Sequence, residues 1–425
     1  MKLIYVVIDG LGDLPLKVLD NQTPLEYAET PNLDFLASIG KVGLMYSVRK
    51  GVAPESDVAV ISILGYDPYR YHVGRGPLEA VGAGLKMMDG DLALRCNFAT
   101  LGNDRRIIDR RVGRNLTTEE ASHLSEAVNK NVSLTSHSAE FEFKNTLGHR
   151  GVLVIRSKTM PLSGNITNTD PAYLKVGGIG IAKKDVEPFL EDCRPLDESE
   201  SSKVSAQLVN EFTWKSHEVL ENHPVNMRRS SNGMLKANVI LSRDAGAELP
   251  KFFDINAHYK VRFACLADMP VERGIAKLAG MHLIEIPPPS GNIKDDCILR
   301  AGKLLSAISN YDCFYIHLKG PDEPGHDGDY KRKIQVIADI DRYFFGRVLE
   351  NVRLQETLFC VTADHSTPCE QMSHTDDPVP VLIAGGKIHP DSAKKFSEKE
   401  CKNGSLGIIE SGNLLMPLLM KLLKE

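Results

Sequence analysis

The chain has 425 residues, of which 42% are hydrophobic and 25% are charged, a globular composition that excludes a disordered or fibrous protein. A single hydrophobic core usually stops growing near ~250 to 300 residues, so the length predicts two domains. The formal net charge of −5 provides no broad basic field, which argues against a nucleic acid or an anionic membrane as partner.

The first predicted strand covers residues 3–8 and ends at Asp9. Asp9 interrupts this apolar stretch too early for a secretory signal or a membrane span. The turn after it contains Gly10 and Gly12, which let the backbone bend sharply. Eight cysteines are scattered without any C-x-x-C pair, which favours reduced core thiols over disulfides or structural zinc. We therefore expect a cytoplasmic protein.

A serine stands at the predicted start of the next helix. Val58, Ile61 and Leu64 recur at helical spacing, which places Ser56 at the N-cap and Asp57 in the first turn. Such a serine commonly serves only as a cap. A helix N-terminus also offers N–H groups and a positive dipole end to a phosphate, and a serine hydroxyl ionised by a nearby metal ion can accept a phosphoryl group. Spacing alone leaves both interpretations open.

The middle of the chain, from about residue 90 to 225, has a different pattern of apolar and polar residues. Short segments with alternating polarity lie at residues 92–98, 140–144 and 151–156, and one helix is predicted at 117–129. The acidic stretch 192–202 is expected to be a loop. We interpret this part as a smaller inserted α+β domain. The predicted boundaries are 89–225 for the insert and 1–88 with 226–425 for the core domain.

Strand and helix patterns alternate through the rest of the chain. Strands are predicted at residues 261–267, 314–318, 358–363 and 379–384, with helices between them at 271–280, 293–308 and 329–349. The strand runs are nearly continuous in apolar residues rather than alternating, which indicates burial on both faces, as in a parallel sheet covered by helices. The alternation predicts an α/β fold with a doubly wound, mostly parallel sheet.

Three of the predicted strands lead into residues that bind metal ions. Ligands of open α/β sheets bind beyond the carboxyl ends of the strands. A single Asp often only caps a helix, and a single His is more often a core or surface residue. Here three strand ends together deliver mixed oxygen and nitrogen donors, which suit Zn²⁺, Mn²⁺ and similar ions. The residues are Asp9; Asp322 and His326, preceded by Lys319; and Asp364, His365 and His374.

The motifs that contain these residues resemble a known family. Asp9 lies in VVIDGLGD, Ser56 lies in APESDVA, residues 74–84 read GRGPLEAVGAG, and LKGPDEPGHD and TADHSTP precede His374. In this order they resemble the cofactor-independent phosphoglycerate mutases of the archaeal-type branch, which belong to the alkaline phosphatase superfamily. The resemblance spans both halves of the predicted core and reaches the insert at LRCNFAT and IIDRRVGR.

The resemblance implies a two-metal site, because paired ions on the order of 4 Å apart clamp the attacking and leaving oxygens in phosphoryl transfer. One ion is expected on Asp9, Ser56, Asp364 and His365, and the other on Asp322, His326 and His374. Mn²⁺ or Mg²⁺ is favoured over Zn²⁺ or Co²⁺. No 2,3-bisphosphoglycerate is expected to be needed.

The resemblance also implies the reaction, a step of glycolysis and gluconeogenesis. Ser56 is expected to attack the phosphate of 3-phosphoglycerate, giving phosphoserine and bound glycerate. The phosphoryl group then returns to the other hydroxyl, which gives 2-phosphoglycerate. Lys319 is expected to neutralise charge on the transferring group or to activate the serine.

The predicted insert carries a dense run of arginines, and guanidinium groups bind carboxylate and phosphate bidentately. Arg105 and Arg106 fit a solvated turn, whereas His149 beside Arg150 is a further candidate. Arg243 precedes Asp244, where the family pattern leads us to expect glycine. The candidate substrate contacts are Arg75, Arg95, Asp109, Arg110, Arg111 and Arg243.

Two alternatives stay open at this point. A metal-dependent phosphomonoesterase or a phosphopentomutase-like enzyme shares the same metal shell, and a non-catalytic relative would keep the fold. The expected partner is a small molecule, 3-phosphoglycerate or 2-phosphoglycerate, with no nucleic acid and no membrane; a homo-oligomer is compatible with the sequence. The other histidines, His72, His217, His258 and His317 among them, are interpreted as structural or surface residues.

Overall fold

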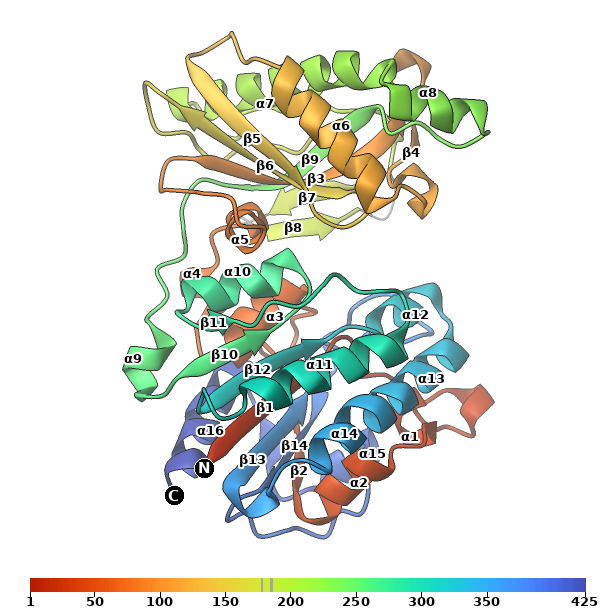
Figure 1. Ribbon diagram of the computed structural model, residues 1–425, viewed down its shortest axis with the longest axis vertical. Helices are drawn as coiled ribbons and strands as arrows, with labels where there is room; N and C mark the ends of the chain where they lie inside the picture. The colour runs from red at the N-terminus through yellow and green to blue at the C-terminus, as the bar shows by residue number, and fades with distance from the viewer. Residues whose placement is uncertain (177–178, 184–185) are drawn as a thin grey trace. The chain divides into compact units, whose positions relative to one another are not determined.

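The computed structural model describes residues 1–176, 179–183 and 186–425, which Figure 1 traces from red to blue. The described chain divides into two compact units: Met1–His72 with Phe252–Glu425 form unit 1, and Val73–Lys251 form unit 2. Unit 2 is longer than the 89–225 expected for the insert. The reason is that α5 (Arg75–Gly82) and β9 (Val239–Gly246) both pack on β3 (Leu92–Leu101).

Unit 1 is built on a mostly parallel sheet. Along the sheet the strands are β11 (His282–Leu283), β10 (Phe263–Leu266), β12 (Cys313–Leu318), β1 (Lys2–Ile8), β13 (Thr357–Thr362), β14 (Val379–Gly385), β2 (Gly40–Met45) and β15 (Gly407–Ile409). β1 pairs in parallel with β12 and β13, whereas β14 runs antiparallel to β13 and β2. The α/β fold with a mostly parallel sheet, predicted from the apolar runs, is confirmed.

Helices cover both faces of this sheet. Every residue of β12 and β13 is buried, and successive side chains of a strand point to opposite faces, so neither face is open to solvent there. One group, α2 (Pro31–Ser38), α11 (Ile293–Ala307), α13 (Tyr330–Ile340) and α14 (Gly346–Leu349), is drawn in front of the sheet in Figure 1. A second group contains α3 (Ser56–Ile63), which packs on α10 (Pro270–Leu278), and α16 (Leu415–Lys424).

Shorter helices complete unit 1. They are α1 (Pro24–Tyr27), α4 (Pro68–Tyr71), α9 (Ile255–Tyr259), α12 (Asp322–Asp327) and α15 (Glu398–Asn403), with 3₁₀ turns at Lys17–Leu19, Leu354–Glu356 and Gly412–Leu414. In the described part of the chain, no helix has the length and apolar character that a membrane crossing requires.

The helix predicted at 329–349 is interrupted in the structure. α13 ends at Ile340, and a π-helical turn (Asp341–Phe345) separates it from α14. The buried carboxylate of Asp341 accepts hydrogen bonds from the backbone N–H groups of Asn32 (3.2 Å) and Leu33 (2.7 Å) at the start of α2. A single π-helical turn is a common way to insert such a tertiary contact into a helix.

Unit 2 is an α+β unit around an antiparallel sheet. Its strands are β3, β4 (Ile107–Asp109), β5 (Ala139–Asn145), β6 (Arg150–Ser157) and β9, and a separate antiparallel pair is formed by β7 (Tyr173–Val176) and β8 (Ile179–Ala182). Its helices are α5, α6 (Thr118–Asn131), α7 (Glu200–Glu221) and α8 (Pro224–Ser231), with 3₁₀ turns at Asn103–Arg105 and Val112–Arg114. β3 pairs with both β6 and β9.

The two faces of the unit 2 sheet have different neighbours. Figure 1 shows α6 and α7 on one face and α5 on the other. Leu94 and Phe98 of β3 lie in the core beneath α6 and α7, and Ala93 lies in a smaller cluster with residues of α5. Because side chains alternate along a strand, Arg95 shares the α5 face with Ala93.

α7 was not predicted. It begins at Glu200, inside the acidic stretch 192–202 that the sequence suggests is a loop, and Ser199 caps it by accepting a hydrogen bond from the backbone N–H of Ser202. Small polar residues occupy part of its buried face, including Ser205 and Ser216, and they weaken the apolar periodicity that identifies a helix.

Candidate active site

Three neighbouring parallel strands bring the predicted metal ligands together. β12, β1 and β13 are adjacent in the sheet, so their carboxyl ends open onto the same edge. Asp9 follows β1, Asp322 begins α12 shortly after β12, and Asp364 and His365 follow β13. His365 Nε2 lies 3.5 Å from Asp9 Oδ1 and 3.3 Å from Asp364 Oδ2.

A glycine allows these loops to approach each other. Gly10 has a φ of +64°, and a Cβ atom built on it would lie 2.7 Å from the Cα of Asp322 and 2.8 Å from Oγ1 of Thr367. Its backbone N–H donates a hydrogen bond to Asp364 Oδ1 (3.1 Å). A side chain at position 10 would therefore push the loops after β1, β12 and β13 apart.

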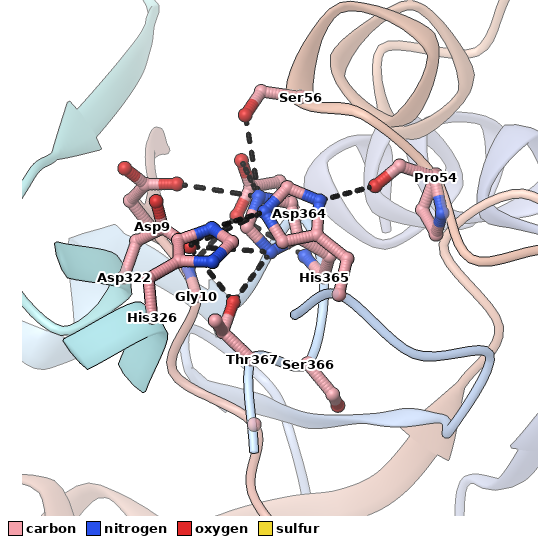
Figure 2. Close-up of polar contacts among 12 residues, drawn as sticks. Asp9, Gly10, Pro54, Ser56, Asp322, His326, Asp364, His365, Ser366 and Thr367 are labelled. Carbon is pink, nitrogen blue, oxygen red and sulfur yellow. Dashed lines mark hydrogen bonds and ion pairs between the residues drawn. The ribbon is translucent and has the colours of Figure 1, made fainter. Parts of the chain in front are cut away.

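Ser56 faces this cluster from α3. Its Oγ lies 3.2 Å from Nε2 of His365, the contact at the top of Figure 2. Glu55 is the N-cap and Ser56 is the first helical residue, with no side-chain cap hydrogen bond at this terminus in the structure. The N-cap assignment of Ser56 is therefore wrong, and its hydroxyl is oriented towards the histidine.

Asp322 collects the histidines of the second predicted ligand set. Its Oδ1 lies 3.4 Å from Nε2 of both His326 and His374, and it accepts a hydrogen bond from Oγ1 of Thr367 (2.8 Å). The Nδ1–H of His374 donates to the carbonyl of Pro54 (2.8 Å), and the ring of His374 stacks on that of His365 with centroids 3.6 Å apart. All seven predicted ligands thus occupy one region of unit 1 (Figure 2).

The donor set fits divalent cations. The inner carboxylate oxygens Asp9 Oδ1 and Asp364 Oδ2 are buried and accept no hydrogen bond from the described residues. Two groups hold donor atoms within 4.8 Å of one another: Asp322 with His365 and His374, and Asp9 with His317 and Asp364. This grouping differs from the division implied by the family resemblance, which assigned His365 to the ion of Asp9 and left His317 out.

The electrostatics of the site follow from burial and close opposite charges. Burial raises the pKa of Asp9 to about 6, with Asp364 adding to the effect and Lys319 opposing it. Burial also acts to raise the pKa of Asp322, but the neighbouring imidazoles, above all His374, hold it well below its usual range. Carboxylates that are buried this close to one another favour a bound cation, which relieves their mutual repulsion.

Two residues that contact the candidate ligands or Lys319, namely His317 and Glu272, were not predicted as site residues from the sequence. His317, interpreted as an ordinary structural residue, lies with its Nε2 3.4 Å from Asp364 Oδ2. Glu272 lies with its Oε1 2.7 Å from Lys319 Nζ and 3.1 Å from His317 Nδ1. Lys319 in turn lies 3.0 Å from Asp9 Oδ2. No sequence pattern marks Glu272, because it sits in a helix far from the ligand motifs.

Unit 2 contains a separate cluster of arginines on its α5 face. Glu79 of α5 is buried, and its Oε1 accepts a hydrogen bond from Arg75 Nε (2.7 Å) and lies 3.2 Å from Arg95 Nε. Arg243 is also buried, and its guanidinium lies over the ring of Tyr173, 3.9 Å from the centroid. Arg95 and Arg243 are opposite each other on β3 and β9.

A histidine reports the cationic character of this cluster. Burial lowers the pKa of His149 to about 3, and the guanidinium groups of Arg150, Arg111, Arg243 and Arg95 contribute to the lowering. A site with this many guanidinium groups around a neutral imidazole favours an anionic ligand. Of the predicted contacts, Arg75, Arg95, Arg111 and Arg243 therefore belong to one cluster with Arg150 and His149.

The remaining candidates have local partners. Arg110 pairs with the buried Asp170 (2.6 Å), and Asp109 Oδ1 accepts a hydrogen bond from the backbone N–H of Arg111 (2.6 Å), so both also shape the loop. Arg105 is partly exposed, pairs with Asp192 and lies over the ring of Trp214. Arg105 therefore lies at the surface of unit 2, as expected for a solvated turn.

The departure at Asp244 has a structural explanation. Its φ is +55°, in the left-handed region where glycine is easiest and Asp is among the better tolerated residues. Its backbone N–H donates to Asn168 Oδ1 (3.2 Å), and its carboxylate lies 3.5 Å from Arg243 Nε. Asp244 therefore keeps the backbone shape that glycine permits and adds a negative charge beside Arg243.

Comparisons with known proteins identify the family of the chain. The family model of 2,3-bisphosphoglycerate-independent phosphoglycerate mutase matches residues 37–226. The enzyme of that name from Aeropyrum pernix is 44% identical with all of both chains covered, and that from Thermococcus kodakarensis is 39% identical over 99% of this chain and 97% of its own.

Two solved structures match over the whole chain. A Pyrococcus horikoshii protein has 34% identity and a TM-score of 0.79, covering 100% of this chain and 97% of its own. A cofactor-independent phosphoglycerate mutase from Thermoplasma acidophilum has 31% identity and a TM-score of 0.62, with 100% of both chains covered. The chain therefore belongs to the family of 2,3-bisphosphoglycerate-independent phosphoglycerate mutases.

Proposed function

We propose that this protein interconverts 3-phosphoglycerate and 2-phosphoglycerate through a phosphoserine at Ser56. The observation that carries the proposal is the position of Ser56 Oγ, 3.2 Å from the buried His365, within a cluster of carboxylates and imidazoles. A hydroxyl at the first residue of α3 also benefits from the N–H groups and dipole of the helix when it carries a phosphoryl group.

Divalent ions bound by these ligands would supply Lewis-acid stabilisation of the transferring phosphoryl group and would lower the pKa of the serine hydroxyl. We infer that Asp9, Asp322, His326, Asp364, His365 and His374 hold them, with Mn²⁺ or Mg²⁺ preferred to Zn²⁺ or Co²⁺. Lys319, 3.0 Å from Asp9, would add a positive charge that helps to neutralise the transferring phosphoryl group.

The arginine cluster of unit 2 is the proposed clamp for the rest of the substrate. A phosphoglycerate carries a carboxylate as well as a phosphate, and bidentate guanidinium contacts match the geometry of both groups. In this proposal Arg75, Arg95, Arg111 and Arg243 hold the glycerate while it turns to present its other hydroxyl. Water must be kept out during that step, because hydrolysis of the phosphoserine would release phosphate.

A coupled assay tests this function. The chelator-treated protein is given 3-phosphoglycerate and one divalent metal at a time, without 2,3-bisphosphoglycerate, and enolase reports any 2-phosphoglycerate. The proposal predicts conversion that depends on added metal and releases little inorganic phosphate. Stoichiometric release of phosphate without 2-phosphoglycerate would instead identify a phosphomonoesterase. The cytoplasmic location stays a prediction from the sequence.

A further inference from the structure

The buried carboxylate of Glu272 lies behind the candidate metal ligands of the active site. Glu272 belongs to α10, its side chain has no exposed area, and the Lys319 ammonium donates a hydrogen bond to its Oε1 (2.7 Å). The same oxygen lies 3.1 Å from Nδ1 of His317. One acidic group thus contacts two basic side chains.

Each of these basic side chains touches a different candidate metal ligand. Lys319 Nζ lies 3.0 Å from Asp9 Oδ2, and His317 Nε2 lies 3.4 Å from Asp364 Oδ2. Asp9 follows β1 and Asp364 follows β13, whereas His317 and Lys319 come from β12 and the residue just after it. Glu272 therefore connects, through two short paths, the carboxylates delivered by two different strands.

The negative charge of Glu272 affects how strongly Lys319 and His317 interact with Asp9 and Asp364. Without Glu272, the nearest acidic partner of Lys319 in the structure would be Asp9, and the imidazole of His317 would keep only Asp364. Each basic group would then interact more strongly with a carboxylate that a cation needs. Removing one partner of a buried charge network also leaves the other charges uncompensated.

We propose that Glu272 is a positioning residue that shares the positive charges of Lys319 and His317, so that these side chains bind Asp9 and Asp364 less tightly and both carboxylates can still bind a divalent cation. The inference rests on the metal-dependent function proposed above. Substitution of a residue that contacts and orients metal ligands typically weakens metal affinity or activity by about 10- to 100-fold.

The test measures cation affinity rather than turnover. Chelator-stripped wild-type protein and Glu272→Gln are titrated with Mn²⁺ in the absence of substrate, by calorimetry or by the electron paramagnetic resonance of free Mn²⁺. We expect about 10- to 100-fold weaker Mn²⁺ binding by Glu272→Gln. Asp341→Asn is the matched control, since Asp341 is an equally buried carboxylate of unit 1 that forms its hydrogen bonds, among the described residues, with Asn32 and Leu33. Its Mn²⁺ affinity should equal that of the wild type.

A double-mutant cycle separates positioning from general loss of charge. If Glu272 acts partly through His317, the effect of Glu272→Gln should be smaller in a His317→Asn background than in the wild type. Glu272→Asp keeps the buried charge and the fold but shortens the side chain, so its Mn²⁺ affinity should lie between wild type and Glu272→Gln.

Three results would overturn the inference: wild-type Mn²⁺ affinity in Glu272→Gln, wild-type affinity in Glu272→Asp, or the same loss in Asp341→Asn. Because no substrate is present, these results are independent of whether the protein is a mutase. A failed coupled assay with intact Mn²⁺ binding would refute only the proposed function.

Discussion

Ser56 Oγ and His365 Nε2 lie 3.2 Å apart although 309 residues separate them in sequence. The contact joins the first residue of α3 to the loop after β13, and it places the hydroxyl over a histidine that also approaches Asp9 and Asp364. A serine used only as a helix cap would bond its own helix instead. This pair therefore argues against the cap, one of the two roles that spacing in the sequence left open, and supports the proposed role of Ser56 as nucleophile.

Substitution of this serine is the first prediction. Ser56→Ala should lower kcat for conversion of 3-phosphoglycerate by about 10³-fold or more, because the covalent intermediate can no longer form. Mn²⁺ binding should be mostly retained, since the carboxylates and imidazoles remain. Ser62→Ala is the control, as Ser62 is a buried serine of the same helix. A Ser56→Ala protein as active as its parent would exclude the phosphoserine route.

The arginine cluster gives a second prediction, again as a pair. Arg95→Met should raise KM for 3-phosphoglycerate by about 10- to 100-fold, the effect of losing one charged hydrogen bond worth ~1.5–3 kcal/mol. Arg105→Met should leave KM unchanged, because Arg105 is partly exposed and already pairs with Asp192. Steady-state kinetics of both variants decide the matter. Equal effects would mean that the cluster around Glu79 does not bind substrate.

A third prediction concerns the loops that carry the ligands. Lys333 of α13 is fully buried, and its ammonium donates hydrogen bonds to Asp13 Oδ2 (2.8 Å) and to the carbonyls of Gly12 (3.1 Å) and Thr367 (2.9 Å). Lys333→Met leaves Asp13 buried without its cation, so the free energy of unfolding should fall by about 3–5 kcal/mol.

Urea unfolding of Lys333→Met against Lys331→Met measures this loss. Lys331 is an exposed residue of the same helix, so its substitution should change the unfolding midpoint little. If both variants unfolded at the same urea concentration, Lys333 would not hold the loops after β1 and β13 together.

Glu398 supplies a prediction about pH. Burial raises its pKa from 4.5 to about 7, although Thr23, which donates a hydrogen bond to Oε2 (2.6 Å), opposes the shift. The folded protein thus holds the proton more tightly than the unfolded chain. The stability that the neutral carboxyl contributes is complete below about pH 4.5 and is lost as the pH rises to about 7.

The Glu398→Gln variant isolates this effect, because glutamine stays neutral throughout. Wild type should lose stability relative to Glu398→Gln between pH 5 and pH 7, and the difference should then level off. Chemical unfolding of both proteins at a series of pH values checks the direction. A difference that does not change with pH would show that Glu398 does not titrate in this range.

The sequence was sufficient to predict that the candidate metal ligands lie close together, because they follow strands that are adjacent and parallel. Asp9 and Asp364 directly follow nearly continuous apolar runs, Asp322 follows another shortly after its end, and the rule that strand ends converge places them together. The fold class followed from the same runs, whose strands are all buried in unit 1.

Other features depend on contacts that have no local pattern. Glu272 reaches His317 of β12 only when α10 packs on β10 and β11, and Glu79 acquires its place only when α5 packs on β3. The limits of unit 2 were missed for the same reason, since β9 joins β3 across more than a hundred residues. The interruption after α13 likewise depends on the contact between Asp341 and α2.

The central claim is that Ser56 carries the phosphoryl group during turnover. Its most direct measurement is mass spectrometry of peptides from protein quenched during reaction with 3-phosphoglycerate and Mn²⁺. The account predicts phosphate on Ser56, absent when Mn²⁺ is chelated beforehand. Continued formation of 2-phosphoglycerate with no phosphate on Ser56, or with phosphate on another residue, would contradict it.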